Sequence, residues 1–174
     1  MFAILKGIDW MTENDREFIL EHIRETTKLL AHHDESNSLV NWSGHCNADR
    51  PARFLVQWCH GAPGIITSLA QFPTDYDLEL EVLLQKAGEM IWQAGPLNKG
   101  VGICHGTDGN AMAFLRLYAR TKNDMWLDRA RAFAMHAISQ RNYRYTYFTG
   151  DLGLAHSLIA CRKRDCRFGM LDYF

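Results

Sequence analysis

Apolar residues recur at intervals of three and four along much of the chain, and this spacing predicts amphipathic helices. Four such runs follow residue 64, and they lie at residues 65–70, 76–94, 111–119 and 127–138. Pro73 ends the first run, Gly95-Pro96 ends the second, and Lys122-Asn123-Asp124 forms a turn between the last two. The pattern therefore predicts two pairs of helices, each joined by a short connection.

A further helix is predicted near the amino terminus. Thr12, followed by Asp15 three residues later, is typical of an N-cap with an acidic first turn, and the apolar face then runs from Phe18 to Leu30. Residues 32–50 are polar and rich in turn-forming types, so we expect a loop there. No alternating pattern of any length indicates a strand. The fold class is predicted to be all-α, built from helical hairpins.

The same short motif occurs three times. A G-x-x-G followed by an apolar run stands at residues 61–64, 106–109 and 150–153, so the first glycines are 45 and then 44 residues apart. Such a period indicates a repeat architecture. Each unit is predicted to consist of a glycine turn, a short helix and a longer helix, and residues 12–30 would be the longer helix of an earlier unit.

Composition narrows the classes of function. The 174 residues are 47% hydrophobic and carry a net charge of −1, which indicates one globular unit and argues against nucleic acid as a partner. No apolar stretch is long enough for a transmembrane segment, and the first ten residues do not form a signal peptide, so we expect an intracellular protein. Five irregularly spaced cysteines favour metal binding or a reactive thiol over a disulfide framework.

Two of the glycine turns carry a Cys-His pair. Thiolate and imidazole are preferred zinc ligands, and three protein ligands leave a fourth position for substrate or water. If the short helices line a common axis, Cys59, Cys104 and His105 meet around one ion although their turns are 45 residues apart. Helix N-termini favour thiolate, and glycines 61 and 106 would let the backbone turn sharply after each ligand. The sequence predicts one zinc ion here.

Other residues allow alternatives. His60 could add a fourth ligand and close the site as Cys₂His₂. The other cysteines are expected to be small buried hydrophobes, and the run 161–164 a solvated helix end. The cysteines expected to be buried in this way are Cys46, Cys161 and Cys166. An anion site built from Lys99, Arg141 or Arg144 is the weaker suggestion that the residues themselves allow.

The two metal turns carry a family resemblance. The segments QWCHGAPG at residues 57–64 and KGVGICHGTDGN at residues 99–110 resemble the carboxy-terminal part of LanC-like proteins, the eukaryotic relatives of bacterial lanthionine synthetase cyclases. The resemblance extends over roughly residues 10–174 and includes the tail at 167–174. It implies a toroid of seven helical-hairpin repeats, of which residues 1–174 would form about three and a half.

The resemblance also implies a chemistry. Cys59, Cys104 and His105 would hold the zinc, and His60 would line the site. Lys99, five residues before Cys104, would contact glutathione, together with an arginine that is either Arg141 or Arg144. In this family the zinc activates a thiol, which adds to a dehydroamino-acid residue and forms a C–S bond.

Three departures from the family pattern bear on that chemistry. Asp108 stands where a small residue is usual, which would place a carboxylate beside the metal turn, and Thr149 replaces an acidic residue before Gly150. The third departure is the absence of the upstream repeats. In this family those repeats supply a histidine that acts as general acid. No residue of these 174 matches it, so we expect a truncated chain.

The sequence therefore supports two hypotheses of different classes. The first is a zinc-dependent enzyme that adds glutathione or a peptide thiol to dehydroamino acids. The second is a zinc- and glutathione-binding module that acts through protein partners without turnover. A cytoplasmic location is expected, with peripheral attachment to the plasma membrane as the alternative.

Overall fold

The computed structural model describes residues 1–45 and 52–172, and within them the chain is mainly helical, which confirms the all-α prediction. The helices are α1 (Phe2–Lys6), the 3₁₀ helix η1 (Ile8–Trp10), α2 (Glu13–Leu29), α3 (Ala62–Ser68), α4 (Leu78–Ala94), α5 (Thr107–Thr121), α6 (Asp124–Ile138) and α7 (Asp151–Lys163). None of the helices in this part of the chain is both long and apolar enough to cross a bilayer.

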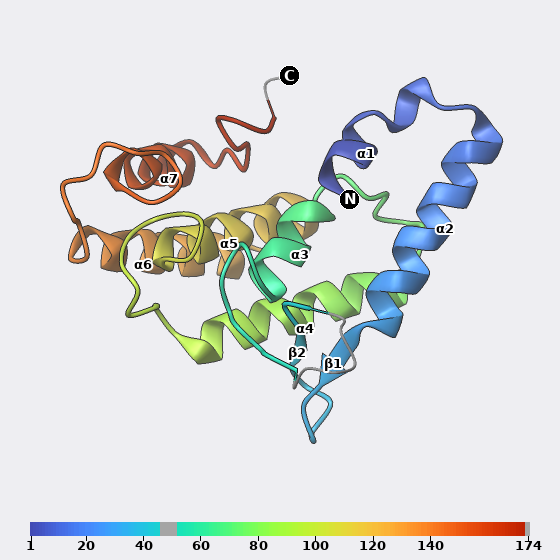
Figure 1. Ribbon diagram of the computed structural model, residues 1–174, viewed down its shortest axis with the longest axis horizontal. Coiled ribbons are helices and arrows are strands. Elements are labelled where there is room, and N and C mark those ends of the chain that lie inside the picture. Colours follow the sequence, from blue (N-terminus) through green and yellow to red (C-terminus); the bar gives the residue numbers. More distant parts are fainter. Residues whose placement is uncertain (46–51, 173–174) are drawn as a thin grey trace.

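The elements follow one another across the molecule. Figure 1 shows α1 and α2 at one side, α7 at the other, and α3, α5 and α6 between them. The segment after α7 returns toward the amino terminus, so the two ends of the described chain are in contact. The Lys6 ammonium donates to the Asp172 carbonyl at 3.4 Å. A buried ion pair between Arg116 of α5 and Asp172 fixes the carboxy-terminal segment over the same region.

Side-chain caps set the starts of three helices. Thr12 accepts a hydrogen bond from the Asp15 N–H, which confirms the predicted start of α2. Asp77 caps α4 and Asn123 caps α6 in the same manner, because Asp and Asn satisfy N–H groups that a helix leaves unpaired. The start of α4 therefore lies two residues after the predicted Tyr76.

The two helices of the second repeat differ in burial although they have the same length. Helix α5 is buried without a break from Thr107 to Leu117, whereas α6 buries one face. This makes α5 an inner helix that packs against α3, α4, α6 and α7. The predicted contrast in length holds for α3 and α4, with 7 and 17 residues. It is wrong for α5 and α6, which both have 15, because burial on all sides supports a longer inner helix.

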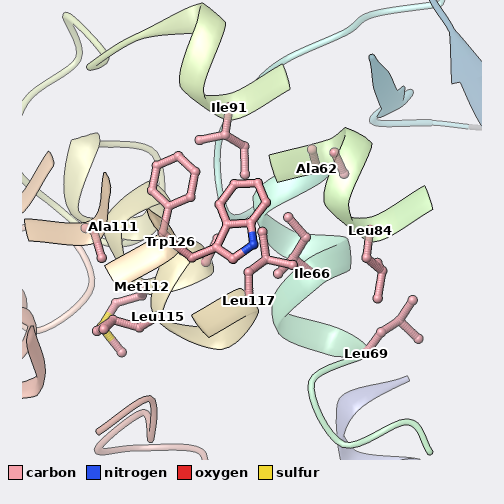
Figure 2. Packing of buried hydrophobic residues seen from close by; sticks show 14 of the residues in the cluster. Ala62, Ile66, Leu69, Leu84, Ile91, Ala111, Met112, Leu115, Leu117 and Trp126 are labelled. Atoms are coloured by element: carbon pink, nitrogen blue, oxygen red, sulfur yellow. The ribbon is translucent and has the colours of Figure 1, made fainter. Parts of the chain in front are cut away.

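The core between the inner and outer helices is organised around Trp126. Its side chain is 1% exposed, and Figure 2 shows it among Ile91 of α4, Leu117 of α5 and Ile66 of α3. Phe114 stacks on the Trp126 ring at 5.9 Å between centroids. Large aromatic side chains contribute much of the buried apolar area in such a core. Trp126 therefore packs the helices of the first repeat against those of the second.

The prediction of a loop over residues 32–50 is wrong in part. Strands β1 (Ala31–His33) and β2 (Val40–Trp42) pair antiparallel as a small hairpin. Asn37 adopts a left-handed φ of 56° in the turn, and the Asp34 carboxylate accepts the Leu39 N–H at 2.7 Å. Three-residue strands are too short to produce a visible alternation, which explains why the pattern did not reveal them.

The hairpin supports the first glycine turn through hydrogen bonds of one side chain. The buried Asn41 of β2 accepts the Ala62 N–H at 2.8 Å, and its amide donates to the Leu55 carbonyl. Gly61, at the N-cap of α3, has no side chain to do this. A residue from the hairpin thus caps the helix that follows the Cys59-His60 pair.

All three glycine turns share one close backbone contact. A Cβ built on Gly61, Gly106 or Gly150 would lie 1.9 to 2.2 Å from the carbonyl oxygen six residues earlier. Only glycine allows this approach. Gly61 alone has a positive φ, of 104°, whereas Gly106 is extended at −108°. The predicted sharp turn is therefore correct for Gly61, and Gly106 is required for space instead.

Backbone hydrogen bonds join equivalent positions of successive turns. The Cys59 N–H donates to the Cys104 carbonyl at 3.1 Å, and the Cys104 N–H donates to the Phe148 carbonyl at 2.8 Å. Residues 59, 104 and 148 are separated by the repeat period of 45 and 44. These bonds bring the N-terminal ends of the three inner helices side by side, as the sequence argument required of a shared metal site.

Candidate metal site

Three side chains with the chemistry of zinc ligands meet where the first two turns touch. The ligand atoms of Cys59, Cys104 and His105 all lie within 4.8 Å of one another. Tetrahedral zinc, with bonds of about 2.0 to 2.3 Å, holds its ligand atoms roughly 3.5 Å apart, so small side-chain movements close the cluster around an ion. Cys59 and His105 are exposed and Cys104 is half-buried, which leaves a side open to solvent.

The protonation of the Cys104 thiol fits an ion-binding cluster. Burial and the neighbouring Cys59 sulfur raise the pKa of Cys104 to about 11. The thiol therefore keeps its proton at neutral pH while no cation is near. A divalent ion bound beside the Cys104 sulfur would stabilise its thiolate, and the binding would release that proton.

His60 lies beside the cluster and outside it. Among the described residues, the set with ligand spacing holds Cys59, Cys104 and His105 without His60. The His60 ring packs on Gly44, where an added Cβ would be 2.8 Å from Nδ1. His60 lines a cavity of about 450 Å³ whose other walls include Trp42, Trp58, Cys59 and Ile65. This position suits a wall of the site better than a fourth ligand.

Lys99 reaches the cluster through a neighbour. Its ammonium donates to the Gln57 side-chain oxygen at 2.8 Å, and the Gln57 amide nitrogen lies 3.1 Å from the Cys59 sulfur. Gln57 is 6% exposed, whereas Lys99 is exposed to solvent. A cation is thus held close to the thiols, where an anionic group of a bound thiol could meet it.

The two candidate arginines lie in the segment before the third turn, and both are exposed. The Arg141 guanidinium stacks over the Tyr143 ring at 5.5 Å. The Arg144 carbonyl is the group that contacts Gly150, so Arg144 takes the place that Gly100 takes in the second turn. Since Gly100 follows Lys99 directly, Arg144 is closer than Arg141 to the position that corresponds to Lys99.

Asp108, whose carboxylate the sequence placed beside the metal turn, is not among the residues whose ligand atoms meet in the cluster. It is fully buried in α5, and the Ser157 hydroxyl of α7 donates to its carboxylate. The other carboxylate oxygen has no hydrogen-bond partner. Burial raises the pKa of Asp108 to about 7. The helix turns this side chain away from the thiols and into the contact between the second and third repeats.

The remaining cysteines agree with a packing role. Cys161 is 4% exposed in α7, and Cys166 packs against the same core. Both carry free thiols, while Cys46 lies outside the described residues. The cations at 162–164 are exposed where α7 ends, as predicted.

Comparison with known proteins identifies the family. The lanthionine synthetase C-like protein family matches residues 3–154. The chain belongs to this LanC-like family. The match includes both metal turns and begins earlier than the resemblance noted in the sequence. The tail at 167–174 lies beyond it and stays a prediction, and residues 173–174 lie outside the described part of the chain.

Two curated relatives of this LanC-like chain share part of its length. A zebrafish (Danio rerio) protein named glutathione S-transferase LANCL1 is 50% identical over 82 residues, which cover 46% of this chain and 20% of that protein. The Arabidopsis thaliana LanC-like protein GCL1 is 41% identical over 106 residues, covering 58% and 24%. The chain thus matches a fifth to a quarter of the length of these relatives.

Two polar residues of the site escaped the sequence argument. Gln57 and Asn41 support the first metal turn, yet neither belongs to a residue type that marks a metal site. Their partners Lys99 and Ala62 are 42 and 21 residues away. Gln57 is the first residue of the QWCHGAPG segment, but its contact with the Cys59 sulfur is visible only in the structure.

Proposed function

We propose that Cys59, Cys104 and His105 hold one zinc ion and that this LanC-like chain uses it to activate a thiol. The observation that carries the proposal is the convergence of these three ligand atoms within 4.8 Å from two separate turns. Two sulfurs and one imidazole are a zinc-selective donor set, and the open side leaves room for a fourth ligand.

The proposed reaction is the addition of a thiol across the C=C bond of a dehydroamino-acid residue. Bound zinc lowers the pKa of a thiol, which near neutral pH is otherwise a few per cent ionised. The thiolate sulfur bonds to the β-carbon of dehydroalanine or dehydrobutyrine, and the α-carbon takes up a proton. His60, Trp58 and Ile65 would form the wall of the cavity that receives the acceptor.

Glutathione is the thiol that the site supports best. Its carboxylates need cations near the metal, and the Lys99 ammonium is held by Gln57 next to the Cys59 sulfur. For the second cation we favour Arg144 over Arg141, because Arg144 lies next to the position in the third turn that corresponds to Lys99. The printed name of the zebrafish relative, a glutathione S-transferase, supports this choice. A cysteine-containing peptide would use the same groups.

The repeat geometry supports a ring-shaped assembly of hairpins. The bonds from Cys59 to Cys104 and from Cys104 to Phe148 connect equivalent positions in order. Continued around an axis, this arrangement gives the α/α toroid that the resemblance implies. We propose that residues 1–174 form about three and a half of its seven repeats, and that the protein works in the cytoplasm or at the inner surface of the plasma membrane.

A second candidate function is a binding module that holds zinc and glutathione for a protein partner. The cavity beside the cluster and the Lys99 ammonium near the Cys59 sulfur support it, since both favour binding of a thiol without requiring an addition step. The site described above serves both functions, because zinc and thiol binding precede any addition.

Zinc content and adduct formation test the proposal in two steps. The purified chain is expected to contain about one zinc per molecule, measured by atomic absorption, and Cys104→Ala is expected to lose it while Cys166→Ser retains it. Full zinc in Cys104→Ala would refute the ligand assignment. The zinc-loaded chain, glutathione and a dehydroalanine peptide are then analysed by mass spectrometry. A thioether adduct supports the enzyme, and glutathione binding without an adduct supports the module.

A further inference from the structure

The side chain of Gln57 lies between a cation and a sulfur. Its amide oxygen accepts from the Lys99 ammonium at 2.8 Å, and its amide nitrogen donates to the Cys59 sulfur at 3.1 Å. With 6% exposure, Gln57 is among the few buried polar side chains of the described chain. A buried amide with both ends paired is held in one orientation.

The neighbours of Gln57 determine which way its amide faces. An ammonium group carries donors only, so the atom next to Lys99 must be the oxygen. The NH₂ group consequently points at the Cys59 sulfur, which accepts its hydrogen bond. The amide therefore holds the Cys59 sulfur through its NH₂ group and the Lys99 ammonium through its oxygen.

A donor on a ligand sulfur affects the metal as well as the cysteine. Charge that the sulfur shares with an N–H is less available to the ion, so the ion remains a stronger Lewis acid toward its open position. Groups behind the ligands typically change metal affinity or activity by about 10- to 100-fold. In this chain the same amide also holds Lys99, so one side chain links the metal ligand to the cation.

We propose that Gln57 is a positioning residue that holds the Cys59 sulfur in place for a metal ion and fixes Lys99 at the edge of the site. This inference rests on the proposed zinc site. The backbone of Gln57 makes its own contribution through two hydrogen bonds with His60, N–H to carbonyl in both directions. Those bonds do not involve the side chain, so the turn persists when the amide is replaced.

The test compares Gln57→Leu with Gln140→Leu in the full chain. Gln140 is a matched control, because it is a half-buried glutamine that also makes two polar contacts, to Leu97 and Thr107, neither of which is a proposed metal ligand. Zinc affinity is measured by competition with a chelator. Gln57→Leu is expected to bind zinc about tenfold more weakly, and Gln140→Leu to bind it as the unaltered chain does.

Cobalt provides a readout that a structural defect would not imitate. In the Co²⁺-loaded chain, the sulfur-to-cobalt charge-transfer band is expected to move to longer wavelength in Gln57→Leu, because the sulfur loses its donor. Lys99→Met serves if Gln57→Leu does not fold. Without the ammonium the amide can turn its oxygen toward the sulfur, so a smaller shift in the same direction is expected.

The outcomes separate this inference from the function on which it rests. If the unaltered chain takes up neither zinc nor cobalt, the proposed function and the positioning role are both wrong. If it binds both metals, but Gln57→Leu or Lys99→Met leaves the affinity and the band unchanged, the positioning role alone is wrong. Weaker binding together with the shifted band supports it.

Discussion

The second glycine turn, at residues 104–109, and the third, at residues 148–153, have similar backbones and different side chains. In each, the first glycine lies against the carbonyl six residues earlier, and the second glycine does the same. The second turn carries Cys104 and His105, whereas the third has Phe148 and Thr149 at the equivalent positions. The third turn therefore has the same backbone contacts as the second but lacks the cysteine and the histidine.

This difference separates two kinds of constraint. The glycines are fixed by neighbouring backbone, which leaves no space for a side chain at any of the three turns. The residues before them project from the turn and are free to serve chemistry or packing. Phe148 uses this freedom to pack, 5.9 Å from the Trp58 ring between centroids. The proposed metal binding therefore depends on particular side chains, which stand on a backbone that the third turn shares without them.

The largest effect is expected where the shared backbone is broken. In Gly109→Ala the new Cβ would lie 2.0 Å from the Ile103 carbonyl oxygen, so α5 must shift. We expect a loss of more than about 3 kcal/mol in the free energy of unfolding, or no folding. Gly7→Ala is the control, since its Cβ would meet atoms at 3.8 Å. Equal stability of the two variants in urea unfolding would contradict the close-contact argument.

A large effect confined to chemistry is expected at the histidine of the second turn. His105→Ala removes a ligand atom and leaves the glycine contacts in place. Zinc affinity should fall by more than about a hundredfold, beyond what changes behind the ligands produce, while the helical circular dichroism signal is retained. Chelator competition measures the affinity. A chain that keeps its zinc after this change would show that the site lies elsewhere.

A smaller effect, on stability alone, is expected where the second repeat packs on the third. Burial raises the pKa of Asp108 from 3.8 to about 7. Between these pH values the unfolded chain has released the proton and the folded chain retains it, so the free energy of unfolding falls as pH rises. From about pH 5 to pH 8 this group should cost on the order of 3 kcal/mol.

Asp108→Asn tests this pH dependence. The variant has no carboxyl group to titrate, so its stability should vary less over the same range and exceed that of the unaltered chain at about pH 8. Urea unfolding at a series of pH values measures both. Parallel curves for the two proteins would show that Asp108 ionises without cost in the folded state.

The smallest effect is expected at the third turn. Thr149→Ala removes a hydroxyl whose contact is the exposed Thr146 hydroxyl at 2.8 Å. Stability should change by less than about 0.5 kcal/mol, as is usual for surface positions, and zinc affinity should stay the same. This variant stands at the position equivalent to His105. A loss of zinc here would extend the metal site into the third repeat and end the contrast between the turns.

Much of the fold follows from local patterns, and the failures have a common cause. The apolar spacing predicts helices α2 to α6 because each of them needs an apolar face. Thr12 marks the start of α2, because its side chain is of a type that caps helices. The hairpin at residues 31–42 was missed because β1 and β2 have three residues each and are stabilised by contacts such as the bond from Trp42 to the Thr27 carbonyl. The full length of α5 was missed because it is buried on every side.

By itself the sequence determined the repeat period, the helical class and the three residues with zinc-ligand chemistry, because each depends on residue types at fixed spacing. Only the tertiary structure decided how those residues meet. It brought Cys59 to Cys104, set Gln57 between Lys99 and the sulfur, and turned Asp108 toward Ser157. The contacts of Cys59 with Cys104, of Gln57 with Lys99 and of Asp108 with Ser157 join residues 42 to 49 positions apart, and their geometry depends on how whole helices pack rather than on any local pattern.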